Sequence, residues 1–225
     1  FGTEMAASPA APPLFIVLNA ASGHAQTRQD FDTIVSVLRA ADREHEILRV
    51  EEPARLAETV RGAVERAKAR QGIVVAAGGD GTVNATAQAV VGSGCTFGVI
   101  PQGTFNYVAR THGIPTDTSG ATRVLLTGRT KPVQVGAVNG RVFLVNASLG
   151  LYPELLEDRE AYKRRFGRSR LVAFGAGLVT LLREHRGLRL RLELDGRATV
   201  HTTPTLFVGN NRLQLEQIGV PQADA

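Results

Sequence analysis

Two glycine-threonine motifs, each placed directly after an apolar run, put the strongest constraint on how this chain folds. The first, Gly-Gly-Asp-Gly-Thr at residues 78–82, follows a buried-strand pattern at residues 73–77 and precedes a helical pattern at residues 83–91. The second motif, at residues 101–106, follows another strand pattern at residues 96–100. Loops at the carboxyl ends of strands in an open α/β sheet meet at one crevice, so we expect both motifs to lie there together.

The first motif has the composition of a phosphate-binding turn. Its glycines let backbone N–H groups approach phosphoryl oxygens, and the helix that follows directs its N-terminus at them. Asp80 is the unusual member of the motif, because a phosphate repels a carboxylate that holds neither a cation nor a proton. We therefore predict phosphoryl transfer. The alternative is a simple strand-to-helix turn in which Asp80 or Thr82 caps the helix.

The amino-terminal half alternates between strand and helix patterns. Strand patterns at residues 14–18 and 46–50 flank a helical spacing of apolar residues at 31–40. Pro53 then begins a long helix whose apolar residues recur on one face. Together with the strands before the glycine motifs, this alternation predicts a βαβαβαβ order. Such an order forms an open parallel sheet with helices on both faces.

The pattern changes near residue 131. An Asn-Gly pair at 139–140 and an Asp-Gly pair at 195–196 each separate two strand patterns, and such pairs predict β-hairpins. Residues 154–186, between the two hairpins, have a helical pattern. With a boundary at 128–132, the predicted parts are a disordered tail or tag remnant at 1–13, a nucleotide-binding α/β kinase domain at 14–130 and a mainly antiparallel, lipid-binding β domain at 131–225.

The composition is that of an ordinary soluble globular chain. Of the 225 residues, 43% are hydrophobic and 21% are charged. No apolar run reaches the ~18–20 residues that span a bilayer. The longest run, residues 171–182, is shorter and contains two glycines. The single cysteine, Cys95, excludes an internal disulfide, fits a reducing cytoplasm and is expected to be buried.

Positive charge is concentrated in one short stretch. The net charge is +5, and residues 159–170 contain six basic residues and a single acid among them. Such a basic cluster attracts phosphate-rich partners, here an anionic membrane surface, or it forms a solvated face. No RNA-recognition or helix-turn-helix pattern accompanies it, so we expect no nucleic-acid partner. The basic cluster consists of Arg159, Lys163, Arg164, Arg165, Arg168 and Arg170.

Several short motifs, in their order along the chain, resemble the diacylglycerol kinase catalytic-domain family, which includes sphingosine and ceramide kinases and bacterial soluble lipid kinases. The resemblance covers most of the chain from Leu14 onward. Residues 78–82 match the family's Gly-Gly-Asp-Gly-Thr motif in full, and residues 101–110 are similar to its Pro-x-Gly-Thr-x-Asn-Asp-x-Ala-Arg segment. Three further segments resemble family motifs: Asn-Ala-Ala-Ser-Gly at residues 19–23, residues 143–150, and Val-Gly-Asn-Asn at residues 208–211.

The resemblance implies an ATP- and Mg²⁺-dependent lipid kinase that transfers the γ-phosphate to a hydroxyl of diacylglycerol or a related lipid. Asp80 is then the candidate catalytic residue and Mg²⁺ ligand. The implied partners are a lipid substrate and an anionic membrane surface, with a homodimer as an allowed assembly. The implied location is the cytoplasm, peripheral at the inner face of the membrane. The candidate nucleotide-binding residues are Asn19, Ser22, Gly23, Gly78, Gly79, Gly81, Thr82, Gly103, Thr104 and Asn106.

The chain departs from the family pattern at three places. Tyr107 replaces the second member of the Asn-Asp pair, residues 212–216 replace a glycine-rich run, and Ala225 precedes the family's Asp-Gly-x-Leu element and later acidic motif. We therefore expect a truncated second domain and an inactive chain in this form. Asn106 either orients the nucleotide or caps a turn. Two other functions stay open: a soluble small-molecule kinase of the NAD kinase type, and a non-catalytic lipid- or nucleotide-binding module.

Overall fold

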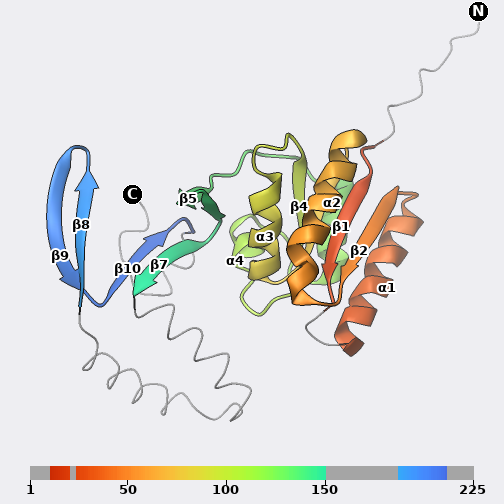
Figure 1. Cartoon of the computed structure of the whole chain (residues 1–225). Coiled ribbons are helices and arrows are strands. Elements are labelled where there is room, and N and C mark those ends of the chain that lie inside the picture. Colours follow the sequence, from red (N-terminus) through yellow and green to blue (C-terminus); the bar gives the residue numbers. More distant parts are fainter. Residues whose placement is uncertain (1–10, 21–23, 151–186, 212–225) are drawn as a thin grey trace, which may run out of the picture. The chain divides into compact units, whose positions relative to one another are not determined.

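The computed structural model of the chain describes residues 11–20, 24–150 and 187–211, and Figure 1 shows the order of their helices and strands. No helix within these ranges is long and apolar enough to cross a membrane. Some sequence-based predictions concern other residues. Outside the described residues lie most of the predicted tail, the helical pattern at 154–186 with its apolar run and basic cluster, and the candidate nucleotide-binding residues Ser22 and Gly23.

A parallel sheet of four strands, in the order β2-β1-β3-β4, forms the centre of the first unit of the chain. The two central strands, β1 and β3, are almost entirely apolar and buried, as parallel strands with both faces covered must be. The predicted strand-helix alternation is therefore confirmed. The strands are β1 (Leu14–Asn19), β2 (His45–Val50), β3 (Ile73–Gly78) and β4 (Thr96–Pro101).

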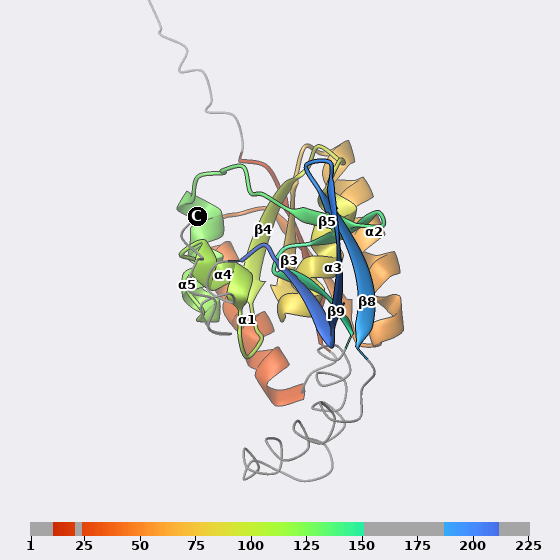
Figure 2. The same ribbon diagram turned by 90° about the vertical axis from the view of Figure 1, so that its left-hand side faces the viewer.

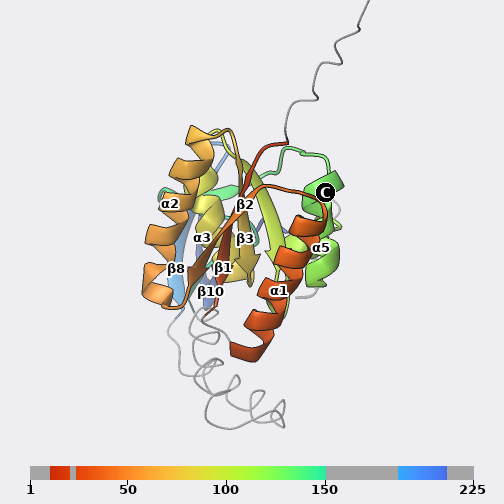
Figure 3. The same cartoon turned by 90° about the vertical axis from the view of Figure 1, so that its right-hand side faces the viewer.

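Helices cover both faces of this sheet, as expected, and Figures 2 and 3 show them on its two sides. On one face, α1 (His24–Ala40) and α5 (Thr118–Thr127) pack against the even-numbered residues of β1. On the other face, α2 (Leu56–Ala69), which follows a short 3-10 turn at Pro53–Arg55, and α3 (Asp80–Val90) pack against the odd-numbered residues. The alternation follows from the two-residue period of a strand.

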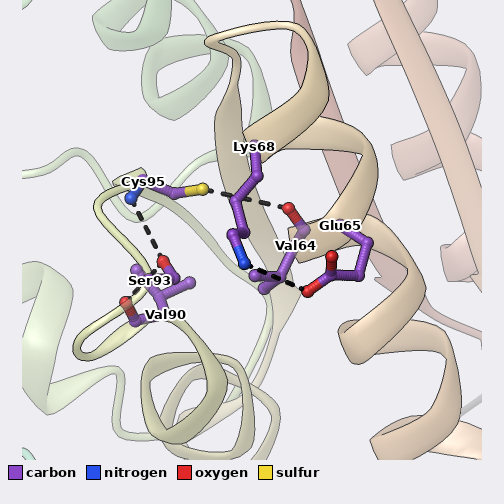
Figure 4. Close-up of polar contacts among 6 residues, drawn as sticks. All are labelled: Val64, Glu65, Lys68, Val90, Ser93 and Cys95. Carbon is purple, nitrogen blue, oxygen red and sulfur yellow. Dashed lines mark hydrogen bonds and ion pairs between the residues drawn. The ribbon is translucent and has the colours of Figure 1, made fainter.

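The loop between α3 and β4 contacts α2 through the polar groups shown in Figure 4. The Ser93 hydroxyl donates to the Val90 carbonyl at 2.7 Å and accepts from the Cys95 N–H at 3.1 Å. The Cys95 thiol donates weakly to the Val64 carbonyl of α2 at 3.9 Å. Cys95 is half-buried, where the sequence predicted full burial, because the loop leaves one side of it at the surface.

A β-hairpin of β5 (Gly136–Val138) and β6 (Arg141–Phe143) follows α5. Its two turn residues have φ values of +49° and +73°, as a two-residue hairpin turn requires, so the hairpin predicted from the Asn-Gly pair is confirmed. The hairpin packs on α3. The first unit accordingly extends to Val145, later in the chain than the boundary predicted at 128–132, and it also includes Asn210 and Asn211.

Two amide side chains of α3, one helical turn apart, hold this hairpin. Asn84 donates to the Val142 carbonyl and accepts from the Leu144 N–H, both at 3.1 Å. Gln88 accepts from the Val142 N–H at 2.6 Å and donates to the Gly140 carbonyl at 3.4 Å. Each amide pairs with one backbone N–H and one backbone carbonyl of residues 140–144. The side chains of α3 therefore satisfy backbone groups of β6 that a neighbouring strand would otherwise bind.

Replacement of Asn84 by alanine is expected to lower the free energy of unfolding by about 1–3 kcal/mol, because two partly buried backbone groups lose their partner. Gln88→Ala should cost less, since Gln88 is exposed and water can replace its amide. Urea unfolding followed by circular dichroism measures both changes. Unchanged stability of the Asn84→Ala protein would show that the hairpin does not depend on this contact.

The second unit is antiparallel, as predicted for the carboxyl-terminal region. β7 (Asn146–Gly150) pairs with β10 (Thr205–Gly209). β8 (Leu188–Leu194) and β9 (Arg197–Thr203) form a hairpin, drawn in blue in Figure 2. The turn residues at 195–196 have φ values of +49° and +73°, which confirms the hairpin predicted from the Asp-Gly pair.

Candidate phosphate site at the carboxyl end of the sheet

The two glycine motifs lie against each other where β3 and β4 end. Gly78 is paired with Pro101 across the two strands, and the Gln102 N–H donates to the Gly78 carbonyl at 2.9 Å. A Cβ added at Gly103 would lie only 2.8 Å from the Cα of Gly79. Glycine is needed at 103 because two backbones touch there. The meeting of the motifs expected from the sequence is therefore confirmed.

Asp80 is the first residue of α3, and Gly79 before it is the N-cap of that helix. The backbone N–H groups of residues 106–108, at the start of α4 (Tyr107–Thr111), lie close enough to the carboxylate to favour its charged form. Because Gly79 is the N-cap, the alternative in which Asp80 or Thr82 occupies that position is wrong. The carboxylate joins the first glycine motif to the helix that follows the second one.

Burial raises the pKa of the Asp80 carboxyl, and the hydrogen bonds from the three backbone N–H groups oppose this rise. Desolvation disfavours the charged form of a carboxyl group, whereas N–H donors and nearby cations favour it. A partly buried carboxylate of this kind gains from binding a cation and can also accept a proton. Both roles predicted for Asp80 are chemically open to it in this environment.

Asn106 closes the loop of the second motif with its own side chain. Its amide oxygen accepts from the Gly103 N–H at 2.8 Å, and its amide nitrogen donates to the Gly103 carbonyl at 2.9 Å. Asn106 is buried and has a φ of +51°, in the left-handed region that asparagine tolerates better than most residues. These contacts support the turn-capping role for its side chain, and a contact with nucleotide stays a prediction.

Asn19 connects the end of β1 to the first glycine motif. Its amide donates to the Thr82 hydroxyl at 2.9 Å. Thr82 is only 4% exposed, and a Cβ added at Gly78 would lie 2.8 Å from the Thr82 hydroxyl oxygen. Thr82 therefore packs beneath the turn, with its hydroxyl toward Asn19. The structure brings Asn19, Gly78 and Thr82 together, and their contacts hold the conformation of the first glycine motif.

Gly81 and Thr104, one from each motif, are exposed. A Cβ added at Gly81 would meet no atom within 4 Å. Gly81 lies in the first turn of α3, where backbone N–H groups have no partner within the helix. An exposed helix N-terminus, an open glycine and a nearby hydroxyl suit an anionic ligand. The described residues of the two motifs therefore fit a phosphate group.

A cation at this site would rely on Asp80. Among the residues that the structure describes, no group of three or more His, Cys, Asp or Glu side chains gathers as a metal cluster. Mg²⁺ commonly takes one or two carboxylates and completes its shell with phosphate oxygens and water. A single half-buried carboxylate beside a phosphate-type turn fits that kind of binding and does not form a cation site by itself.

Tyr107 stands where the family resemblance implies an aspartate. Its ring stacks on that of Phe105, with centroids 5.5 Å apart and planes 8° apart. Its backbone N–H is one of those that donate to Asp80. Since a backbone group makes that contact, the substitution at 107 changes the side chain near the second motif and leaves the Asp80 contact in place.

The sequence analysis gave no role to Asn211, which forms hydrogen bonds with α4. Asn211 is 4% exposed, and its amide donates to the Thr111 hydroxyl at 2.8 Å and to the Tyr107 carbonyl at 3.4 Å. The signal in the sequence was its place in the Val-Gly-Asn-Asn segment at residues 208–211, which resembles a family motif but assigned Asn211 no role. A contact between residues 100 positions apart has no local pattern, so only the tertiary structure could show it.

Comparison with known proteins agrees with this arrangement. The sequence model of the family described as "Diacylglycerol kinase catalytic domain" matches residues 13–138. A diacylglycerol kinase of Bacillus subtilis is 34% identical over 129 residues, which cover 56% of this chain and 42% of that protein. A diacylglycerol kinase of Staphylococcus aureus strain JH9 is 30% identical over 156 residues, which cover 67% of this chain and 48% of that protein.

A solved structure described as a diacylglycerol kinase from Bacillus anthracis strain Sterne is similar in fold. It matches with a TM-score of 0.66 and 25% identity, over 89% of this chain and 64% of that one. The chain spans less than half the length of the two curated relatives named above. The match with the family model includes both glycine motifs and ends at the first strand of the β5–β6 hairpin.

Proposed function

Because the chain belongs to the diacylglycerol kinase catalytic domain family, we propose that it transfers the γ-phosphate of ATP to a hydroxyl of diacylglycerol or a related lipid. Kinases commonly carry out this transfer with Mg²⁺, which offsets the charge that develops on the phosphate oxygens. The single observation that carries the proposal is the contact between the two glycine motifs, with Asp80 between the first motif and α4.

The candidate nucleotide-binding residues divide into two groups in this proposal. Gly81 and Thr104 are exposed and offer a backbone N–H and a hydroxyl to phosphate oxygens, and Gly79 and Gly103 let the backbones approach. The side chains of Asn19, Thr82 and Asn106, with the backbone of Gly78, hold the shape of the motifs through the contacts described above. Ser22 and Gly23 stay predictions, since they lie outside the described residues.

Asp80 is proposed as the residue that acts at the transferred phosphate. Its carboxylate is half-buried and held by backbone donors, so it is positioned before substrate binds. In this position it binds the cation on the phosphate oxygens or takes the proton that leaves the lipid hydroxyl as the new P–O bond forms. The partial burial of Asp80 strengthens either electrostatic interaction.

The second unit is proposed to bind the lipid, at the cytoplasmic face of a membrane. Four of its large apolar side chains are at least 48% exposed, which suits contact with acyl chains. The basic cluster at 159–170, which would hold the protein to anionic headgroups, lies outside the described residues. The homodimer allowed by the family resemblance stays a prediction. The exposed side chains are Leu149, Leu194, Val200 and Val208.

Transfer of ³²P from ATP tests the proposed activity directly. The intact protein is incubated with labelled ATP, Mg²⁺ and either an extracted lipid pool or NAD. Label in a lipid phosphate supports the lipid kinase and would contradict the inactivity expected from the sequence, and label in NADP would support a kinase of the NAD kinase type. Binding of ATP or lipid without transfer to either acceptor would support a non-catalytic module. A chelator such as EDTA should abolish transfer if a divalent cation is required.

Gly81→Ala is expected to weaken ATP binding about tenfold without unfolding the protein. The added methyl group meets no atom of the chain, and the φ of Gly81 is outside the left-handed region. Any loss of affinity therefore comes from a clash between the methyl group and the ligand. Isothermal titration calorimetry with ATP and Mg²⁺ measures the dissociation constant.

Gly62→Ala is the matched control for this variant. Gly62 lies in α2, and a Cβ there also meets no atom within 4 Å. It should bind ATP as the unchanged protein does and be about 0.5–1 kcal/mol more stable, since alanine is the better residue inside a helix. Equal ATP affinity of both alanine variants and the unchanged protein would rule out a phosphate at Gly81.

A further inference from the structure

One side chain forms hydrogen bonds with both ends of α4. The amide of Asn211 donates to the hydroxyl of Thr111, the last residue of α4, and to the carbonyl of Tyr107, the first residue. Asn211 is 4% exposed, so water does not compete freely for these bonds. The contact spans 100 positions in the sequence and belongs to the first unit of the chain.

α4 is too short to hold its own conformation. It has five residues, and helices of that length gain too few internal hydrogen bonds to repay the cost of nucleation. Its first backbone N–H groups are nevertheless among those that lie near the Asp80 carboxylate and lower its pKa. The geometry around Asp80 therefore depends on tertiary contacts that keep α4 in place, and the Asn211 amide makes two of these.

The neighbouring residue, Asn210, makes a different set of contacts. Its side-chain amide donates to the carbonyls of Gln134 and Leu144, at 3.1 and 3.2 Å, and its backbone N–H donates to the Val145 carbonyl at 2.7 Å. These bonds hold Asn210 beside residues 134 and 144–145 of the first unit. None of these contacts is with α4. Asn210 and Asn211 are thus adjacent and both hydrogen-bonded, but only the Asn211 side chain bonds to α4.

We propose that Asn211 is a positioning residue of the kinase site, which holds α4 so that its backbone donors keep the Asp80 carboxylate in place. This inference rests on the proposed function for its catalytic consequence, although the contact itself does not.

Amide hydrogen exchange tests the contact without any need for activity. The protein is digested after exchange, and the peptide that contains residues 102–112 is followed by mass spectrometry. Asn211→Ala should speed exchange of this peptide, because α4 loses the side chain that joins its two ends. Asn210→Ala is the matched control and should leave this peptide unchanged. Equal effects of both variants, or of neither, would overturn the proposal.

Steady-state kinetics test the consequence for the reaction. With saturating detergent-dispersed diacylglycerol, Asn211→Ala should lower kcat about tenfold, since a misplaced carboxylate reacts less often. The KM for ATP should stay within about twofold, because the donors of α3 are untouched. Thr111→Val, which removes the hydroxyl acceptor, should also lower kcat. Thr111→Ser keeps that acceptor and should have the turnover of the unchanged protein. If the contact is merely structural, the variants should differ from the unchanged protein in thermal stability and none of them in kcat.

The two arms of the experiment separate the two proposals. If the unchanged protein phosphorylates no lipid, the proposed function fails, and hydrogen exchange still decides whether Asn211 holds α4. If lipid is phosphorylated and Asn211→Ala has a normal kcat, the proposed function stands and the positioning role is wrong. Faster exchange with unchanged kcat would likewise reject the positioning role.

Discussion

Replacement of Asp80 by asparagine is expected to lower the turnover of lipid phosphorylation by at least about 100-fold. Asparagine has nearly the same shape and keeps one oxygen that can accept from the backbone N–H groups of residues 106–108. It carries no charge, so it binds Mg²⁺ poorly and takes no proton. The rate of ³²P transfer from ATP to dispersed diacylglycerol measures the effect, and circular dichroism checks the fold.

Glu65→Gln is the matched control for Asp80→Asn. It also neutralises a carboxylate, but one on the exposed surface of α2, 3.5 Å from Lys68. Surface pairs of this kind contribute about 0–1 kcal/mol, so both stability and turnover should be nearly normal. If Asp80→Asn also kept normal turnover, Asp80 would be a structural acceptor for the start of α4 and not a catalytic group.

Gly103→Ala is expected to separate the two glycine motifs and abolish tight nucleotide binding. The added Cβ would lie 2.8 Å from the Gly79 Cα and 2.9 Å from the Asn106 amide oxygen. The first of these atoms is backbone, and the second is fixed by its hydrogen bond to Gly103, so neither can move away at low cost. We expect ATP affinity to fall more than about tenfold and unfolding to require about 1–3 kcal/mol less free energy.

Gly79→Ala is the control that separates crowding of the Gly79 Cα by a Cβ at 103 from a general loss of stability on substitution in the glycine motifs. Its Cβ would lie 3.4 Å from the Gly103 Cα, an ordinary contact, and Gly79 has a φ of −78° that alanine adopts freely. This protein should fold with near-normal stability. Equal stability of the Gly103→Ala and Gly79→Ala proteins, measured by urea unfolding, would show that the close approach at Gly103 is not what holds the motifs together.

The sequence alone predicted the sheet and the two hairpins, because their signals are local. A continuous apolar run predicts a strand that is covered on both faces, as in β1 and β3. The Asn-Gly and Asp-Gly pairs predict turns because these residues adopt the positive φ values observed at 139–140 and 195–196. The meeting of the glycine motifs also followed, since parallel strands end at one edge of the sheet.

The tertiary structure alone decided what the individual side chains of the site contact. Asp80 could cap its own helix or reach another one, and local spacing does not distinguish these choices. The structure directs it to the backbone of residues 106–108. Asn84 and Asn211 pair with backbone or side-chain groups that are 58 to 104 positions away in the sequence. Which distant group pairs with an amide depends on how the helices pack, and no local pattern contains that information.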